Sequence, residues 1–179
     1  MRIVTKRLVL RTPTLRDAED IASSANDIEV SRYLARVPYP YSVKNARHFI
    51  KFRRKQAKEN LYSFGITLKK TGKIIGMIGF IRFDDSNKKA ELGYWLGRKY
   101  WRQGIMEEAL RAIIKFTFNK LKMNRLEAGV AVENKPSANL LKKVGFVKEG
   151  KKRKSMKSRA TGKWHDTYFF GLLESEVKK

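Results

Sequence analysis

Apolar residues recur at helical spacing in four parts of the chain. The first set follows Thr14 and Asp17, whose spacing is typical of a pair that caps a helix N-terminus. The other three sets lie in 42–58, where we expect Ser42 to be the N-cap, in 107–121 and in 135–146. This spacing predicts about four amphipathic helices, with these residues turned inward: Ala18, Ile21, Ala22, Ala25, Ala46, Phe49, Ile50, Arg53, Leu110, Ile113, Ile114, Thr117 and Leu121.

The segments between these helices have the composition of β-strands. They are "RLVLR" (7–11), two strands joined by the turn "KKTGK" within 61–83, "AELGYWLG" (90–97), "RLEAGVAVEN" (125–134) and "WHDTYFFGLL" (164–173). The order along the chain is therefore a strand, two helices, three strands, a helix, a strand, a helix and one or more final strands, without a repeat or a linker. This order predicts a single domain over 1–179 of the α/β (α+β) class, built on one mixed sheet.

Composition narrows the function classes. The chain has no cysteine, which excludes disulfides, thiolate zinc sites and cysteine nucleophiles. It has only two histidines, and no apolar run approaches the roughly 18 residues of a membrane span. The N-terminus also lacks the apolar stretch of a signal peptide. We therefore expect a soluble, metal-free, cytoplasmic protein that makes no membrane contact.

The chain is strongly basic, with 41 Lys and Arg against 17 Asp and Glu and a net charge of +24. Such a charge favours polyanionic partners: nucleic acid, a nucleotide cofactor or an acidic protein. Two stretches, 44–58 and 151–164, each carry seven basic residues and no acid. The first is expected to be the basic face of a helix. The second has weak periodicity, so we expect a mobile loop that contacts a ligand or partner.

Residues 93–110 read "GYWLGRKYWRQGIMEEAL", in which strand-like sequence passes into helix-like sequence through a turn that contains Gly104. The first amides of a helix have no partner within the helix, and the helix dipole adds positive charge, so such a turn is suited to an anion. Gly104 lets a phosphate approach the backbone, and Arg98, Lys99 and Arg102 add formal charge. The alternative is an ordinary structural turn.

A wider pattern favours the phosphate interpretation. The segments "AELGYWLGRKYWRQGIMEEAL" and "VENKPSANLLKKVGF" resemble the GNAT superfamily of acetyl-CoA-dependent N-acetyltransferases, and within it the RimJ/RimL group of ribosomal-protein N-terminal acetyltransferases. "RLVLR", "GKIIGMIGF" and "WHD" extend the likeness over nearly the whole chain. The superfamily turn is Gln/Arg-x-x-Gly-x-Gly/Ala. Here Trp101 and Met106 depart from it, although "QGIM" is RimL-like.

The resemblance implies a fold and a cofactor site. The fold is a GNAT-like domain with a twisted, mostly antiparallel sheet of six to seven strands flanked by about four helices. The backbone amides from Gln103 to Met106 would hold the pyrophosphate of acetyl-CoA, and the strand end from Trp95 to Gly97 would pair with the pantetheine arm. The implied cofactor-binding residues are Trp95, Leu96, Gly97, Arg98, Arg102, Gln103, Gly104, Ile105, Met106, Asn134 and Ser137.

The resemblance also implies the catalytic groups. Ser137 matches a serine that protonates the departing thiolate. Many relatives place a tyrosine acid one turn later, where this chain has Leu141. Glu91 matches a general base of several relatives; the alternative is that it orders a loop or pairs with a nearby cation. The glutamate expected upstream of the final "HD" has no equivalent here, so either Glu91 or bulk water would take the proton. Asn134 binds pantetheine or fixes its loop.

The acceptor side is less defined. Tyr39, Tyr41, Tyr94 and Glu91 are candidates to bind the substrate, although packing is the alternative for the first two. We expect His165 to be structural. An α-amino group, with a pKa of about 7.7–8.0, is neutral far more often than a lysine with a pKa of about 10.4, so an enzyme without a strong base suits α-amines.

These observations predict an enzyme that moves acetyl directly from acetyl-CoA to a free amine, in a ternary complex. The expected acceptor is the N-terminus of a protein, ribosomal or acidic, and the enzyme is expected to be a monomer or homodimer. Two alternatives stay open. One is acetylation of a small amine, a polyamine or aminoglycoside. The other is a non-catalytic protein on the same scaffold that binds RNA or the ribosome through its basic surface.

Overall fold

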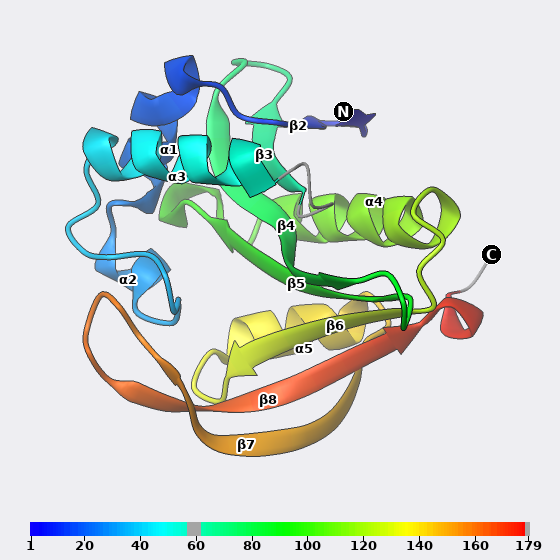
Figure 1. Cartoon of the computed structure of the whole chain (residues 1–179). Coiled ribbons are helices and arrows are strands. Elements are labelled where there is room, and N and C mark those ends of the chain that lie inside the picture. Colours follow the sequence, from blue (N-terminus) through cyan, green and yellow to red (C-terminus); the bar gives the residue numbers. More distant parts are fainter. Residues whose placement is uncertain (57–61, 178–179) are drawn as a thin grey trace.

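A computed structural model describes residues 1–56 and 62–177 of the chain. Its strands form one sheet in the order β1-β2-β3-β4-β5-β6-β8-β7 (Figure 1). The strands are β1 Arg2–Val4, β2 Leu8–Arg11, β3 Ser63–Leu68, β4 Ile74–Asp84, β5 Lys89–Leu96, β6 Arg125–Ala131, β7 Val147–Lys157 and β8 Trp164–Leu173. The β5–β6 pair is parallel, and the other neighbouring pairs are antiparallel. The expected mixed, mostly antiparallel sheet is confirmed.

Helices cover both faces of the sheet. The helices are α1 Ala18–Ala25, α2 Ile28–Ser31, α3 Val43–Gln56, α4 Ile105–Asn119 and α5 Lys135–Lys143. Apolar residues of α4 and α5 pack with one face of the strands in the larger buried cluster. Those of α1 and α3 pack with Ile74, Met77 and Trp95 on the opposite face. Burial of two apolar layers against one sheet is the main force holding this architecture together.

The expected helices are present, and their caps are those the pattern predicted. Asp17 accepts hydrogen bonds from the backbone N–H and the hydroxyl of Thr14, at 2.6 and 2.9 Å. Asp17 also accepts two from Arg11, at 2.8 and 2.6 Å, which joins β2 to the start of α1. The hydroxyl of Ser42 accepts the N–H of Asn45 at 3.2 Å, as an N-cap does. Residues 57 and 58 of the basic stretch 44–58 lie outside the described residues.

The structure corrects the expectation for 151–164. Residues up to Lys157 belong to β7, an eleven-residue strand that pairs with β8, and a mobile loop is the wrong description. The sequence pattern could not show this, because nearly every side chain of β7 is exposed and apolar alternation is missing. Backbone pairing holds the strand, and its lysines lie over aromatic rings of β8: Lys148 over Tyr168 at 4.5 Å and Lys152 over Phe169 at 3.9 Å.

Two short elements were also missed. The strand β1 has three residues and α2 has four, and both are too short to produce a periodic pattern. Together with β7 they raise the described elements to eight strands and five α-helices, against the expected six to seven strands and about four helices. Among the described residues, none of the helices has the length and apolar composition needed to cross a bilayer.

Candidate active site

The sheet opens into a wedge between β5 and β6. The ladder between these parallel strands ends at the pair Leu92 and Ala128. Beyond it, β5 continues to Leu96 along β4, while β6 continues to Ala131 along β8. The strands therefore diverge, and the edge of β5 from Gly93 to Leu96 has no ladder with β6. Backbone groups at such an edge are available to an extended ligand.

Two hydroxyl groups meet across this wedge. Tyr94 lies on β5 and Ser137 lies in the first turn of α5, and their oxygen atoms are 2.8 Å apart. Burial raises the pKa of Tyr94 to about 12, against the smaller opposing effect of its hydrogen bond with Ser137. Tyr94 therefore stays protonated at neutral pH, and it can orient the serine hydroxyl or return a proton to it. The sequence had placed Tyr94 with the substrate, apart from Ser137.

Asn134 holds the start of α5. Its side-chain oxygen accepts the backbone N–H of Ser137 at 3.3 Å, so it is the N-cap of the helix. The sequence left two roles open for Asn134, binding of pantetheine and fixing of its loop. This contact fixes the loop. By setting the first turn of α5, the cap also sets the position of the Ser137 hydroxyl in the wedge.

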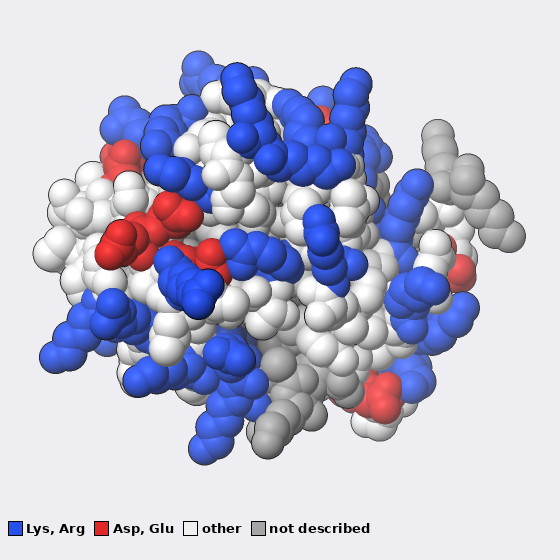
Figure 2. Space-filling view, turned by 90° about the horizontal axis from the view of Figure 1, so that it is seen from above, with Lys and Arg blue, Asp and Glu red and all other residues white. Residues whose placement is uncertain are grey.

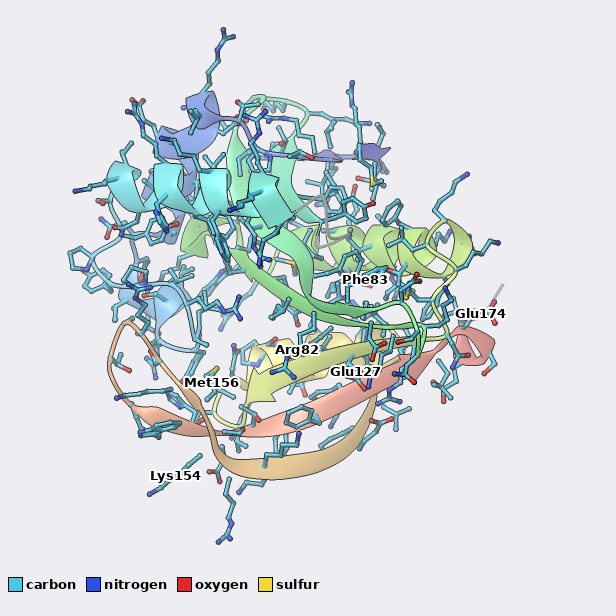
Figure 3. The ribbon with its side chains drawn as sticks, viewed as in Figure 1. Arg82, Phe83, Glu127, Lys154, Met156 and Glu174 are labelled. Atoms are coloured by element: carbon cyan, nitrogen blue, oxygen red, sulfur yellow. The ribbon has the colours of Figure 1, made fainter. Side chains whose placement is uncertain are left out.

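Glu91 lies on the opposite face of the sheet from Tyr94. Its ladder partners are Arg82 on β4 and Glu127 on β6, so the three side chains share that face. Figure 3 labels Arg82 on β4 and Glu127 on β6, the two strands that flank β5. A Glu91 carboxylate oxygen lies 3.6 Å from Nε of Arg82, and a Cβ added at Gly129 would be 3.9 Å from the other oxygen. Glu91 thus reaches the narrow end of the wedge while pairing with a cation.

The turn after β5 has the geometry expected of an anion site. Gly104 is the N-cap of α4 with a φ of +69°, a conformation that favours glycine. The first bond of the helix runs from the N–H of Glu108 to the carbonyl of Gly104, at 3.1 Å. The amides of Ile105, Met106 and Glu107 therefore precede the helical ladder. The predicted residues Gln103 to Met106 lie together at this turn, next to the end of β5.

Arg7 is a site residue that sequence reasoning missed. Its guanidinium donates to a Glu108 carboxylate oxygen at 2.7 Å and to the carbonyl of Gln103 at 2.8 Å. A Cβ at Gly104 would lie 3.5 Å from it, so this cation stands directly beside the glycine. Local spacing could not predict this contact, because it joins residues about a hundred positions apart. The only sequence signal for Arg7 was its place at the start of "RLVLR".

Two other contacts fix the turn. The indole N–H of Trp101 donates to the carbonyl of Leu96 at 2.7 Å, which gives the atypical first residue of the turn motif a structural role. That carbonyl is one of the groups expected to meet the pantetheine arm. Arg98 lies 3.7 Å from Asp27, the residue that caps α2, so a predicted cofactor cation also ties α2 to the end of β5. Arg102 is exposed and has a φ of +60°.

The two tyrosines of the loop before α3 differ in their surroundings. Tyr41 is buried with α1 and α3 at 7% exposure, and this burial raises its pKa to about 12. The contacts of Tyr41 are those of a residue that packs in the core, which was the alternative to substrate binding. Tyr39 has 47% of its surface exposed. Its assignment to the acceptor side stays a prediction.

Comparison with known proteins identifies the scaffold. Residues 7–147 match the acetyltransferase (GNAT) domain family. The chain belongs to the GNAT family. It is 38% identical over 175 residues to the uncharacterized N-acetyltransferase p20 of Bacillus licheniformis, a match that covers 97% of each chain. A solved GNAT-family acetyltransferase from Bacillus anthracis covers 98% of this chain and 100% of its own, with a TM-score of 0.84 and 26% identity.

A further match supports the RimJ/RimL-like group within the GNAT family. The ribosomal-protein-serine acetyltransferase of Escherichia coli strain K12 is 36% identical over 81 residues, which is 45% of each chain. The expected fold and enzyme class are therefore confirmed: this GNAT chain is an N-acetyltransferase. In that context the wedge, the hydroxyl pair and the glycine turn form its candidate active site.

Proposed function

We propose that this GNAT enzyme transfers acetyl from acetyl-CoA to the α-amino group of a protein N-terminus, directly and within a ternary complex. The observation that carries the proposal is the Tyr94–Ser137 pair at 2.8 Å in the wedge, beside the edge of β5 and the glycine turn. Together these features provide a strand edge, an anion-binding turn and a hydroxyl donor, which are the three groups a CoA thioester requires.

In this proposal the cofactor binds along the end of β5. The free amides at the start of α4, among them those of Ile105 and Met106, hold the pyrophosphate, and Arg7 and Arg102 supply positive charge beside it. The pantetheine arm pairs with the strand from Trp95 to Gly97. The thioester then lies between the diverging strands, where Ser137 protonates the departing thiolate and Tyr94 supports the serine. The proton of the amine passes to Glu91 or to water.

Two arguments support a protein N-terminus as acceptor. An α-amine is neutral at pH 7 more than a hundred times as often as a lysine side chain, given pKa values of about 7.7–8.0 and about 10.4. The similarity to a ribosomal-protein-serine acetyltransferase favours the same class of acceptor. Figure 2 shows Lys and Arg over much of the face above α1 and α3. A net charge of +24 repels polyamines and aminoglycosides, which disfavours the small-amine alternative.

The test combines binding with product analysis. Calorimetry of the whole chain with acetyl-CoA is expected to show one site per chain. Mass spectrometry of a peptide panel incubated with acetyl-CoA is expected to place the acetyl group on the α-nitrogen. Failure to bind acetyl-CoA would contradict the cofactor assignment, whereas acetylation of internal lysines alone would contradict the acceptor assignment.

A further inference from the structure

A cavity of about 320 Å³ lies where the loop after β6 meets α2 and the start of β8. Helix α2, the loop between β6 and α5, the β7–β8 hairpin and β8 line it. Figure 1 shows α2 and the hairpin close together at this end of the sheet. The lining residues are Ile28, Glu29, Arg32, Tyr33, Glu133, Thr161, Lys163 and His165. Its volume is at the lower end of the range, about 300–1,000 Å³, that small ligands occupy.

One pair in this lining joins a buried histidine to an exposed glutamate. His165 is only 4% exposed, and its Nδ1 lies 3.2 Å from a carboxylate oxygen of Glu133. Its other ring nitrogen, Nε2, is buried and has no hydrogen-bond partner among the described residues. A His165 ring with a proton on Nδ1 donates to Glu133, and Nε2 is a buried polar atom of the kind that is normally hydrogen-bonded. The Glu133 side chain is 43% exposed, so the carboxylate is open to a ligand.

Cations from two neighbouring elements line the cavity with Glu133. Lys163 comes from the hairpin and lowers the pKa of Glu133 further. Arg32 of α2 is paired with Glu29 at 2.7 Å and lies over the ring of Tyr33 at 4.7 Å. Burial works to raise the pKa of Glu133, but its hydrogen bonds and Lys163 outweigh burial and hold the pKa below its ordinary value. Glu133 is therefore ionised at neutral pH.

The mixed lining selects a type of ligand. Glu29 and Glu133 match an amine, while Arg32 and Lys163 match carbonyl oxygens. The end of a peptide offers both groups within one residue. A polyamine offers only cations, which the two basic residues repel. The cavity thus contains carboxylates within a chain of net charge +24. Its charged groups complement those of a peptide N-terminus.

The chain connects this cavity to the transfer site. Glu133 lies one residue before Asn134, the cap that positions Ser137 on α5. On β6, positions 127, 129 and 131 alternate onto the sheet face that carries Glu91, which is the face opposite Tyr94, and Gly129 leaves that face open between Glu127 and Ala131. The acceptor can then reach the wedge from the cavity while the cofactor occupies the other side. Glu91, in contrast, is already engaged with Arg82.

We propose that this cavity receives the amino end of the acceptor, and that the Glu133 carboxylate, positioned by His165, takes the proton of the amine. The inference rests on the proposed function, and it replaces Glu91 or water as the proton acceptor. The amine nitrogen forms a bond to the thioester carbon, the carbon–sulfur bond breaks, and the thiolate takes the proton of Ser137. The proton from nitrogen goes to Glu133 and then to solvent, while Tyr94 or solvent returns one to Ser137.

The decisive experiment compares three charge-removing variants in the intact chain. Glu133→Gln is expected to lower kcat/KM for a Ser-first peptide at least tenfold, with little change in the KM for acetyl-CoA. Glu91→Gln is expected to lower it less than Glu133→Gln does. Glu174→Gln is the control, because Glu174 lies at the opposite end of β8 from the cavity (Figure 3), and it is expected to behave as wild type.

His165 is tested as a positioning residue. His165→Leu removes the hydrogen bond to Glu133, whereas His165→Asn keeps a donor near the position of Nδ1. We expect the leucine variant to lose acceptor kcat/KM at an unchanged KM for acetyl-CoA, and the asparagine variant to recover most of it. Thermal unfolding of both variants provides the check on folding, and the largely exposed Glu133 keeps the test valid if His165 variants do not fold.

The outcomes separate the two levels of the proposal. Wild-type protein that does not acetylate any peptide would contradict the proposed function itself. Active wild-type protein with a Glu133→Gln variant within threefold of it, or with Glu91→Gln as the more damaging change, would overturn the role of Glu133. Equal loss in the leucine and asparagine variants at His165 would show that this histidine only supports the fold.

Discussion

At the scale of single residues, the pairing of Tyr94 with Ser137 is the contact that most changes the interpretation of this site. Ser137 was identified from the sequence because it matches a serine of the RimJ/RimL group that the chain resembles. Its partner could not be identified in that way, since the two residues are 43 positions apart and meet only through the divergence of β5 from β6. The same reason hid Arg7 and the Glu133–His165 pair: each depends on long-range contact rather than on spacing.

Replacement of Ser137 by alanine tests the leaving-group role. We expect kcat to fall at least tenfold, about 1.4 kcal/mol in activation free energy, with the KM for acetyl-CoA nearly unchanged. The physical reason is that protonation of the thiolate acts in the transition state and not in ground-state binding. Steady-state kinetics measures this, and Tyr94→Phe should give a smaller loss of the same kind. An unchanged kcat with chemistry rate-limiting would leave Ser137 with a structural role only, through its hydrogen bond with Tyr94.

Asp17 provides a stability prediction with a defined pH dependence. Burial works to raise its pKa, but hydrogen bonds from Arg11 and Thr14 outweigh burial and lower it below the ordinary value of 3.8. Its stabilising contribution is therefore complete above that ordinary value and is lost as pH falls through the lower folded pKa. We expect Asp17→Asn to reduce the free energy of unfolding at pH 7 by about 1–3 kcal/mol. Urea unfolding at pH 7 and near pH 3 should show a smaller difference at the lower pH.

At the scale of elements, hydrophobic periodicity predicted the strands that face the core and the long helices. It did not predict β7. The strands that face the core alternate or run continuously apolar, so their position was evident. The strand β7 is held by its ladder with β8 and by cations over rings, and neither produces a local pattern. The glycine turn was identified because Gly104 separates two clear elements. Its function depends on the free amides that this separation leaves at the start of α4.

The glycine turn before α4 gives a prediction on acetyl-CoA binding. Gly104→Val places a β-branched side chain at a φ of +69° beside the free amides, so we expect at least tenfold weaker acetyl-CoA binding by calorimetry. Gly72→Val is a matched control, because Gly72 has a φ of +70° and no heavy atom within 4 Å of an added Cβ. It should produce similar backbone strain without loss of affinity. Equal loss in both variants would show that strain, and not the anion site, determines the result.

At the scale of the whole molecule, the charge distribution separates attraction from recognition. The net charge of +24 acts over long distances and attracts acidic chains, while the cavity near α2 contains two carboxylates of its own. Cations of β7 extend along the outer edge of the sheet, on the hairpin that lines this cavity. An acceptor with an acidic sequence after its N-terminus can therefore contact β7 while its amine enters the cavity. Salt screens the attraction between the acidic sequence and β7 far more than the binding of the amine in the cavity.

We therefore expect Ser-first peptides with acidic downstream sequence to have a lower KM than matched basic peptides, at low salt. The ratio should shrink as ionic strength rises, because steering by exposed charges fades beyond a Debye length of about 8 Å at physiological salt. Replacing Arg153, Lys154 and Lys157 of β7 by glutamine should remove most of the ratio. Replacing Lys115, Lys120 and Lys122, which are exposed around the C-terminal end of α4, removes the same charge and should leave most of the ratio intact. Basic peptides preferred at every ionic strength, or equal effects of both triple variants, would show that β7 does not select the acceptor.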